Sequence, residues 1–477
     1  MPTRVSPLLT ALVWLLAASP LPAQASAGWD AIDFDSLRQE ATGRLSDYLR
    51  INTSNPPGNE LAAARWLREV LAREGIEGQI LDTTEIGPGR ANFYARLKGT
   101  GKGKAIALVH HMDVVPADRK FWKEDPFGGA VKDGAVWGRG ALDMKGQGII
   151  QLMAFIALKR AGIPLSRDVV LIANADEEAA SQGVQTFIER HRDLIRDVEY
   201  LLTESDQTRV EQGKVRWFGI DVGEKRSYWQ RLTVHGVASH GSQPTPFNPV
   251  PRLARIIARI AAWETPLHLT PAVERYFKAQ APQATGRARA WLADPAAALR
   301  TREGRAWLLR EPERNALLRN TISPTVLVGS DKINSIPSEA SVDLDIRLLP
   351  DQDPEAFKQQ LLRVIADTGA QLTQFKSGLS PRYSAPLNTD MVRAIERTVG
   401  RLLPGTPVAT PINTGGSDRP YYAETGIICY GLAPYLVDRE EQDREYHGVD
   451  ERMPIASLDF GLRLYVGIVR EMERGSQ

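Results

Sequence analysis

Short apolar runs alternate with amphipathic segments through the first part of the chain. The runs at 105–109, 168–173 and 200–202 have the length and composition of buried strands. The segments at 147–161 and 184–191 carry apolar residues at helical spacing. Because strands that alternate with helices are typical of α/β folds, the pattern predicts a mostly parallel sheet.

The pattern changes after about residue 221. Residues 228–234 and 340–348 alternate between apolar and polar positions, as strands with one wet face do, and 249–263 has the spacing of an amphipathic helix. Residues 265–320 are rich in Ala and Arg and favour helices and loops. We therefore expect an α+β domain inserted into the α/β domain, with boundaries at 26–222 (first part), 223–350 (insert) and 351–477 (second part).

The first residues have the pattern of a targeting segment. Arg4 precedes an apolar run at 8–18, and Ala23-Gln24-Ala25 and Ala25-Ser26-Ala27 offer small-residue cleavage sites. The run is too short to span a bilayer comfortably, and no other segment resembles a membrane span. We therefore expect residues 1–25 to be a signal peptide and the mature protein to be secreted or periplasmic.

Composition narrows the classes of partner. The chain has 477 residues and a formal net charge of +1, which gives no reason to expect nucleic acid or an anionic membrane as a partner. Its length suits two domains rather than one core. Its only cysteine is Cys429, so no internal disulfide can form.

Candidate chemistry lies where the predicted strands end. His111 and Asp113 directly follow the strand at 105–109, where open α/β sheets place their ligand sites. An imidazole can bind a metal ion, and a neighbouring carboxylate can orient the ring and raise its basicity. The alternative is that His111 is an ordinary loop histidine.

Three further carboxylates also lie next to the ends of predicted strands or helices. Asp143 precedes the helix at 147–161, and its two oxygens could bridge two cations, although Asp is also a preferred helix N-cap. Glu177 and Glu178 follow the run at 168–173. Adjacent side chains point in different directions, so one could bind a metal ion while the other serves as general base. The alternative for this pair is a solvated acidic loop.

Three more residues complete the candidate set. Glu204 and Asp206 follow the strand at 200–202, and either could be a ligand, while His447 lies far downstream. Two imidazoles and several carboxylates together form a ligand set for zinc or similar cations, which favour these donors.

The order of these motifs resembles the dinuclear-zinc family of aminoacylases, acetylornithine deacetylase, succinyl-diaminopimelate desuccinylase and related carboxypeptidases. The resemblance covers almost the whole mature chain, and the long insert looks like that of the carboxypeptidase S branch. It implies a zinc-exopeptidase-like catalytic domain interrupted by a lid and dimerisation domain. The matching motifs include His111-Met112-Asp113-Val114-Val115-Pro116, Asp143-Met144-Lys145-Gly146, Asp176-Glu177-Glu178, Ser239-His240-Gly241, Asn334 with Ile336-Pro337, Asp345-Ile346-Arg347, Gly415-Gly416-Ser417-Asp418 and His447-Gly448.

The resemblance implies a role for each candidate. Glu177 would be the general base, and Asp113 would orient His111. His240 of the lid would stabilise the oxyanion, often across a dimer interface, and a cis peptide bond would follow Asp143. Two divalent cations, zinc in the first place, would be held by His111, Asp143, Glu178, Glu204 (with Asp206 as the alternative) and His447, with Asp143 bridging both.

The resemblance also implies the class of substrate. Arg347 would hold a substrate carboxylate by bidentate hydrogen bonds, with Asn334 and Gly416 helping to position the substrate. These roles predict an exported carboxypeptidase that removes a C-terminal amino acid from a peptide or dipeptide, and a homodimer through the lid. The first alternative is an N-acyl-amino-acid amidohydrolase with the same site. A noncatalytic peptide- or metal-binding protein is the alternative from another class, and the complete ligand set argues against it.

Overall fold

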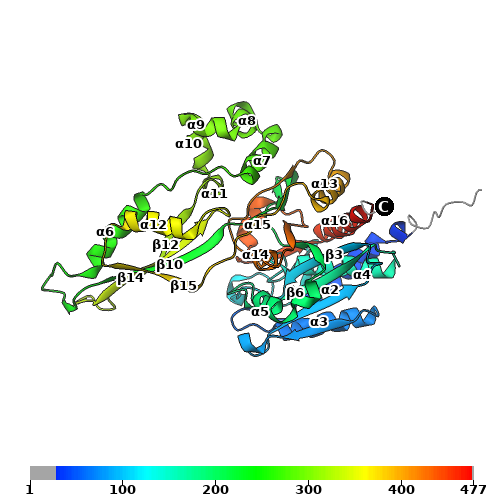
Figure 1. The fold of residues 1–477 in the computed structure, drawn as a ribbon. Helices are drawn as coiled ribbons and strands as arrows, with labels where there is room; N and C mark the ends of the chain where they lie inside the picture. The colour runs from blue at the N-terminus through cyan, green and yellow to red at the C-terminus, as the bar shows by residue number, and fades with distance from the viewer. Residues whose placement is uncertain (1–27, 475–477) are drawn as a thin grey trace, which may run out of the picture.

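The computed structural model describes residues 28–474, apart from the side chains of residues 84, 376 and 377. The predicted signal peptide lies outside the described residues and stays a prediction. Two bodies are visible, an α/β body with a large sheet and an elongated arm with a smaller one (Figure 1). Within the described part of the chain, no helix is both long and apolar enough to cross a membrane.

The α/β body is built on a nine-stranded sheet. Its four central strands pair in parallel, as the apolar runs predict, and antiparallel pairs flank them. In spatial order the strands are β1 (Gly78–Asp82), β2 (Ala91–Leu97), β6 (Arg167–Asn174), β3 (Gly103–His111), β7 (Val198–Thr203), β17 (Ile428–Leu432), β9 (Lys214–Asp221) and β16 (Val408–Ala409), with β8 (Arg209–Glu211) paired to β9.

Helices cover this sheet because its central strands are apolar on both faces. Residues of β6 are buried along its whole length, which requires a layer on each side. Helix α4 (Lys145–Arg160) is buried from Lys145 to Leu158, as a helix in the middle of a layer must be. Its neighbours are α2 (Phe34–Leu49) and α16 (Ile455–Arg474). The Tyr48 ring of α2 stacks on the Trp66 ring of α3 (Glu60–Arg73). Helices α5 (Gln182–His191) and α14 (Arg419–Ala423) pack against β2 and β17, respectively.

The arm, called the lid below, is an antiparallel sheet with helices on one face. Its strands are ordered β12 (Thr321–Val328), β14 (Glu339–Leu348), β10 (Arg226–His235) and β15 (Ala370–Leu379), and α6 (Pro249–Ala262) and α12 (Pro354–Ile365) cover it. Buried and wetter positions alternate along β10 and β14, as the sequence pattern predicts. Because β15 pairs with β10, the lid sheet includes residues beyond 350, where the sequence analysis ended the insert.

The Ala- and Arg-rich segment folds into five short helices, which Figure 1 shows as a green group beside the lid. Its buried side chains, among them Val273, Tyr276 and Phe277, belong to the core of the α/β body and not to the core of the lid. This helical block thus lies within the insert in sequence but packs with the other domain. The helices are α7 (Pro271–Gln280), α8 (Gly286–Ala293), α9 (Pro295–Arg300), α10 (Arg302–Arg310) and α11 (Pro312–Leu317).

Replacement of Phe277 tests whether the helical block is part of that core. Phe277 is fully buried, so Phe277→Ala is expected to lower the free energy of unfolding by about 3–5 kcal/mol. Chemical denaturation of the purified variant measures the change. Phe121→Ala, at a side chain with 64% of its surface exposed, is the control and should change stability by less than about 0.5 kcal/mol. A loss below 1 kcal/mol for Phe277→Ala would mean that the block is a loosely attached appendage.

Candidate metal centre and active site

The candidate ligands meet at the carboxyl ends of the central strands. His111 is the last residue of β3, Glu177 and Glu178 follow the end of β6, and Glu204 directly follows β7. Parallel strands end at the same edge of a sheet, so side chains far apart in sequence gather there. The His447 loop, between α15 (Arg439–Glu445) and β18 (Arg452–Pro454), closes the cluster.

Asp143 lies between the two histidines. One oxygen, Oδ1, lies 3.1 Å from His111 Nε2, and the other, Oδ2, lies 3.2 Å from His447 Nε2. The side chain does not cap α4, whose N-cap residue is Met144. The Asp143–Met144 peptide bond is cis, as the family resemblance implies. The carboxylate therefore has the geometry that a ligand shared by two cations requires.

Two groups of potential ligand atoms share His111. One contains His111, Asp143 and Glu178, the other contains His111, Glu177 and Glu204, and the atoms within each group lie within 4.8 Å of one another. Glu178 Oε2 is also 3.1 Å from His447 Nε2, and Glu204 Oε2 is 3.6 Å from His111 Nε2. The structure thus brings together all five residues for which the sequence analysis expected a metal-binding role.

The alternative ligand, Asp206, is paired with residues outside the acidic cluster, although it lines the same pocket. Its carboxylate is 3.8 Å from the Arg439 guanidinium and accepts a hydrogen bond from the Gln207 side chain. Neither group of potential ligand atoms includes it. The sequence left open whether Glu204 or Asp206 is the metal ligand. Glu204 has the better position for this role.

Asp113 organises the site in a way that the sequence did not indicate. His111 Nδ1 lies 2.9 Å from the backbone carbonyl oxygen of Asp113, whereas the Asp113 carboxylate is 3.5 Å away. That carboxylate accepts hydrogen bonds from the backbone N–H groups of Glu177 (3.1 Å) and Glu178 (3.0 Å) and from the Asn55 side chain (2.8 Å). Asp113 therefore fixes the His111 ring mainly through its backbone and fixes the Glu177-Glu178 turn through its side chain.

Burial perturbs the acidic groups strongly. Burial, followed by the neighbouring Glu204 carboxylate, raises the pKa of Glu177 well above its ordinary range. Burial and the Asp143 carboxylate raise the pKa of Glu178 to about 7. Burial alone would lower the pKa of His111, but hydrogen bonds with Asp113, Asp143 and Glu204 raise it well above 6.5. A buried excess of carboxylates is costly unless cations compensate it.

The donor set fits divalent cations. Glu178 Oε1 is buried and has no hydrogen-bond partner in the described structure, so this oxygen is available as a ligand. Buried polar atoms without partners are rare because each costs free energy, and a bound ion would remove that cost. Two imidazoles with several carboxylates are donors that zinc and similar ions accept.

Two adjoining pockets open beside the cluster. One of about 310 Å³ is lined by Asp143, Glu177, Glu204 and His447 among others. The second, of about 380 Å³, is lined by Glu177 and by Arg347 of the lid, and Gly416 borders both. A substrate that filled them would contact the acidic cluster and Arg347 at once.

The lid holds Arg347 in a fixed orientation. Arg347 Nε donates to Asp345 Oδ1 at 2.8 Å and Nη1 donates to Ser227 Oγ at 3.2 Å. The guanidinium carbon lies 5.6 Å from the centre of the Trp229 ring, within the range of a cation–π contact. Trp229 also lines the pocket and is not among the residues predicted from the sequence, although it lies on the predicted alternating strand.

His240 and Asn334 do not join the cluster in the single chain. Both residues are exposed and lie beyond the far end of the lid sheet. His240 belongs to the short strand β11 (Ser239–His240), which pairs with β13 (Ser335–Ile336). Asn334 directly precedes β13, and its carbonyl oxygen accepts a backbone hydrogen bond from Gly241. Arg347 pairs with Ser227 at the opposite end of β10. A strand of ten residues is about 30 Å long, so the expected contacts with the metal centre are absent within one chain.

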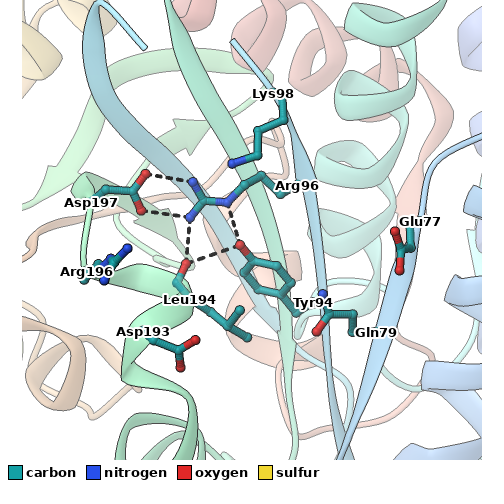
Figure 2. Close-up of a pocket in the computed structure, with 9 residues that line it drawn as sticks. All are labelled: Glu77, Gln79, Tyr94, Arg96, Lys98, Asp193, Leu194, Arg196 and Asp197. Atoms are coloured by element: carbon teal, nitrogen blue, oxygen red, sulfur yellow. Dashed lines mark hydrogen bonds and ion pairs between the residues drawn. The ribbon is translucent and has the colours of Figure 1, made fainter. Parts of the chain in front are cut away.

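A larger pocket, of about 510 Å³, lies away from this chemistry. Figure 2 shows Arg96 at its centre, facing Tyr94, Leu194 and Asp197. The five N–H donors of Arg96 are all used, by these three residues and by Asp168. We therefore interpret this pocket as a structural ion-pair cluster at the sheet edge.

Comparisons with known proteins identify the family of the chain. Residues 107–471 match the model of Peptidase family M20/M25/M40. The chain is 25% identical to an N-fatty-acyl-amino acid synthase/hydrolase (PM20D1) from Xenopus tropicalis over 77% of this chain and 72% of that protein. It is 28% identical to a succinyl-diaminopimelate desuccinylase from Methylobacterium nodulans over 84% of this chain and 88% of that protein.

Solved structures agree on the fold. The metallo-carboxypeptidase Sso-CP2 from Sulfolobus solfataricus superposes with a TM-score of 0.69 at 19% identity, over 90% of this chain and 98% of that one. This similarity confirms the expected α/β catalytic domain with a lid. The match over residues 107–471 places the chain in Peptidase family M20/M25/M40, so it is a metal-dependent hydrolase of the peptidase and aminoacylase kind.

Proposed function

We propose that the protein is a zinc-dependent hydrolase that releases an amino acid with a free carboxylate from a small peptide. One observation carries the proposal: Arg347, a cation fixed by its neighbours, shares a pocket with Glu177 of the acidic cluster. A guanidinium suits recognition of a carboxylate, because its N–H groups match both carboxylate oxygens. The bond that is hydrolysed would lie between this anchor and the cluster.

An N-acyl amino acid is the second candidate substrate. It would offer the same free carboxylate and the same amide bond, with an acyl group in place of the N-terminal residue. The names of two relatives, an N-fatty-acyl-amino acid synthase/hydrolase and a succinyl-diaminopimelate desuccinylase, favour this class. The two candidates differ on the acyl side of the scissile bond.

In the proposed mechanism the ligands are His111, Asp143, Glu178, Glu204 and His447. Two divalent cations bound there would lower the pKa of a water molecule and polarise the scissile carbonyl group. Glu177 borders both pockets and accepts a proton from the attacking water at a carboxylate oxygen. It then donates this proton to the leaving amide nitrogen, while Arg347 keeps the leaving amino acid in place.

We further propose that His240 acts in a homodimer, on the active site of the partner subunit. The edge strand β12 has unpaired backbone groups along one side and exposes Val326, Leu327 and Val328. Such an edge can pair with a second copy of itself, which would join two lid sheets. In that arrangement His240 could reach the oxyanion of a tetrahedral intermediate and donate a hydrogen bond to it.

Complementation of two variants tests the proposed role of His240. Glu177→Gln and His240→Asn homodimers are each expected to be nearly inactive. Co-expression should restore about a quarter of the wild-type activity, because half of the dimers are mixed and each contains one intact site. The activity of the purified mixed dimer is measured. His235→Asn, at the end of β10 in the lid sheet, is the control. If the mixed dimer is as inactive as both parents, His240 does not act across the interface.

Release of amino acids from matched substrates tests the proposed function. The mature protein, loaded with Zn²⁺, is given dipeptides, the same dipeptides with a C-terminal amide, and N-acyl amino acids. Cleavage of the free dipeptides with rejection of the amides would support the carboxypeptidase or dipeptidase assignment. Preference for the acyl amino acids would move the assignment to the second candidate. Failure to release an amino acid from any of them, with metal bound, would refute both.

A further inference from the structure

One buried carboxylate outside the ligand set contacts the loop that carries Asp143. Glu451 Oε1 accepts hydrogen bonds from the backbone N–H groups of Leu142 (2.7 Å) and Asp143 (3.0 Å). Glu451 Oε2 accepts from Gly140 N (2.8 Å) and from Arg139 Nη1 (2.7 Å). The side chain is completely buried, and its four hydrogen bonds use the acceptor capacity of a carboxylate.

The same contacts reach the loop of a second candidate ligand. Glu451 lies four residues after His447, and Arg139 also donates a hydrogen bond to the carbonyl oxygen of Gly448. The Glu451–Arg139 pair therefore joins the Asp143 loop to the His447 loop. His447 has a backbone φ of +52°, which is unfavourable for a residue with a side chain and persists only where neighbouring contacts hold it.

We propose that Glu451 is a positioning residue for the two-cation site. It fixes the backbone at Asp143 so that the two carboxylate oxygens face His111 on one side and His447 on the other. Asp113 does the same for the Glu177-Glu178 turn, so two of the ligand-bearing loops are each held by a buried carboxylate. This inference rests on the proposed function, since it concerns the ligands of the same site.

Replacement of Glu451 by Gln should loosen the Asp143 loop without emptying the space. The amide keeps one acceptor oxygen, but its NH₂ group would face backbone N–H groups or Arg139. Both sides would then be hydrogen-bond donors, so these hydrogen bonds could not form. Partners of metal ligands typically contribute about 10- to 100-fold in metal affinity. We therefore expect at least one of the two Zn²⁺ ions to bind about tenfold or more weakly in Glu451→Gln.

Calorimetric titration of the metal-free full-length mature protein with Zn²⁺ measures this affinity directly. The matched control is Glu471→Gln on α16, another buried carboxylate that is paired with arginines, Arg397 and Arg401, away from the site. The control is expected to lose thermal stability as well, but it should bind both ions as the wild type does. Excess Zn²⁺ should restore activity to Glu451→Gln, which a general folding defect would not allow.

Glu451→Asp keeps the negative charge and covers the case in which Glu451→Gln does not fold. Its carboxylate is one methylene group shorter, so an intermediate loss of Zn²⁺ affinity is expected. If the folded variants bind two ions with wild-type affinity, the proposed role of Glu451 is overturned while the two-cation function stands. If the wild-type protein itself binds fewer than two ions, the two-cation function is overturned and this inference with it.

Discussion

Glu177→Gln is expected to lower kcat by about 10²- to 10⁴-fold, the usual contribution of a general base. The carboxamide has nearly the shape of the carboxylate, but it cannot accept the proton of the attacking water. Glu177 borders both pockets, so its side chain faces the space in which the substrate would lie. Single-turnover and steady-state rates on the preferred substrate measure the loss, with bound metal determined on the same samples.

The adjacent residue supplies the matched comparison. Glu178 Oε2 lies 3.1 Å from His447 Nε2, and Glu178 Oε1 has no partner among the described residues. Glu178→Gln is therefore expected to lose bound metal, whereas Glu177→Gln is expected to keep it. Because Glu177 also lies within a potential ligand group with His111 and Glu204, the metal content decides between the two roles. Loss of one ion in Glu177→Gln would make Glu177 a ligand.

Local patterns predict the parts of the site that lie at strand ends. The apolar runs at 105–109, 168–173 and 200–202 correspond to β3, β6 and β7, and these strands are adjacent in the sheet. Once the strands are parallel and adjacent, the residues that follow them must lie close together. The proximity of His111 to Glu204 follows from these patterns and from general rules of sheet topology.

Contacts between distant segments leave no such pattern. Strand β15 belongs to the lid only because it pairs with β10. This pairing depends on a distant segment and not on the local sequence of β15. The helical block at 271–317 packs on the α/β body although both of its ends connect to the lid. Hydrophobic periodicity indicates that a face is buried, but it does not indicate which surface buries it.

The hydrogen bonds that support the site could not be predicted from the sequence either. The Asp113 carboxylate binds backbone groups 64 and 65 residues away, and Glu451 binds backbone groups about 310 residues away. Backbone N–H groups are present at almost every residue, so the sequence cannot mark which of them a carboxylate will meet. His240 illustrates the same limit, since its motif is clear but the fold places it on β11, away from the acidic cluster.

Arg347→Gln is expected to lower kcat/KM about 10- to 150-fold for substrates with a free carboxylate, since a hydrogen-bonded charge contributes about 1.5–3 kcal/mol. Substrates with a C-terminal amide should be affected little, because they offer no carboxylate to lose. Rates for a dipeptide and its amide, each with the wild type and the variant, separate the carboxylate contact from other effects of the substitution.

Arg231→Gln is the matched control, because Arg231 also forms an ion pair with an aspartate, Asp343, on the lid sheet. Arg231 does not line either pocket beside the cluster, so its replacement should leave the preference for the free carboxylate unchanged. If Arg347→Gln lowered kcat/KM equally for the acid and the amide, Arg347 would have only a structural role in the lid. A loss confined to the acid would mean that the lid, through Arg347, selects substrates by their free carboxylate.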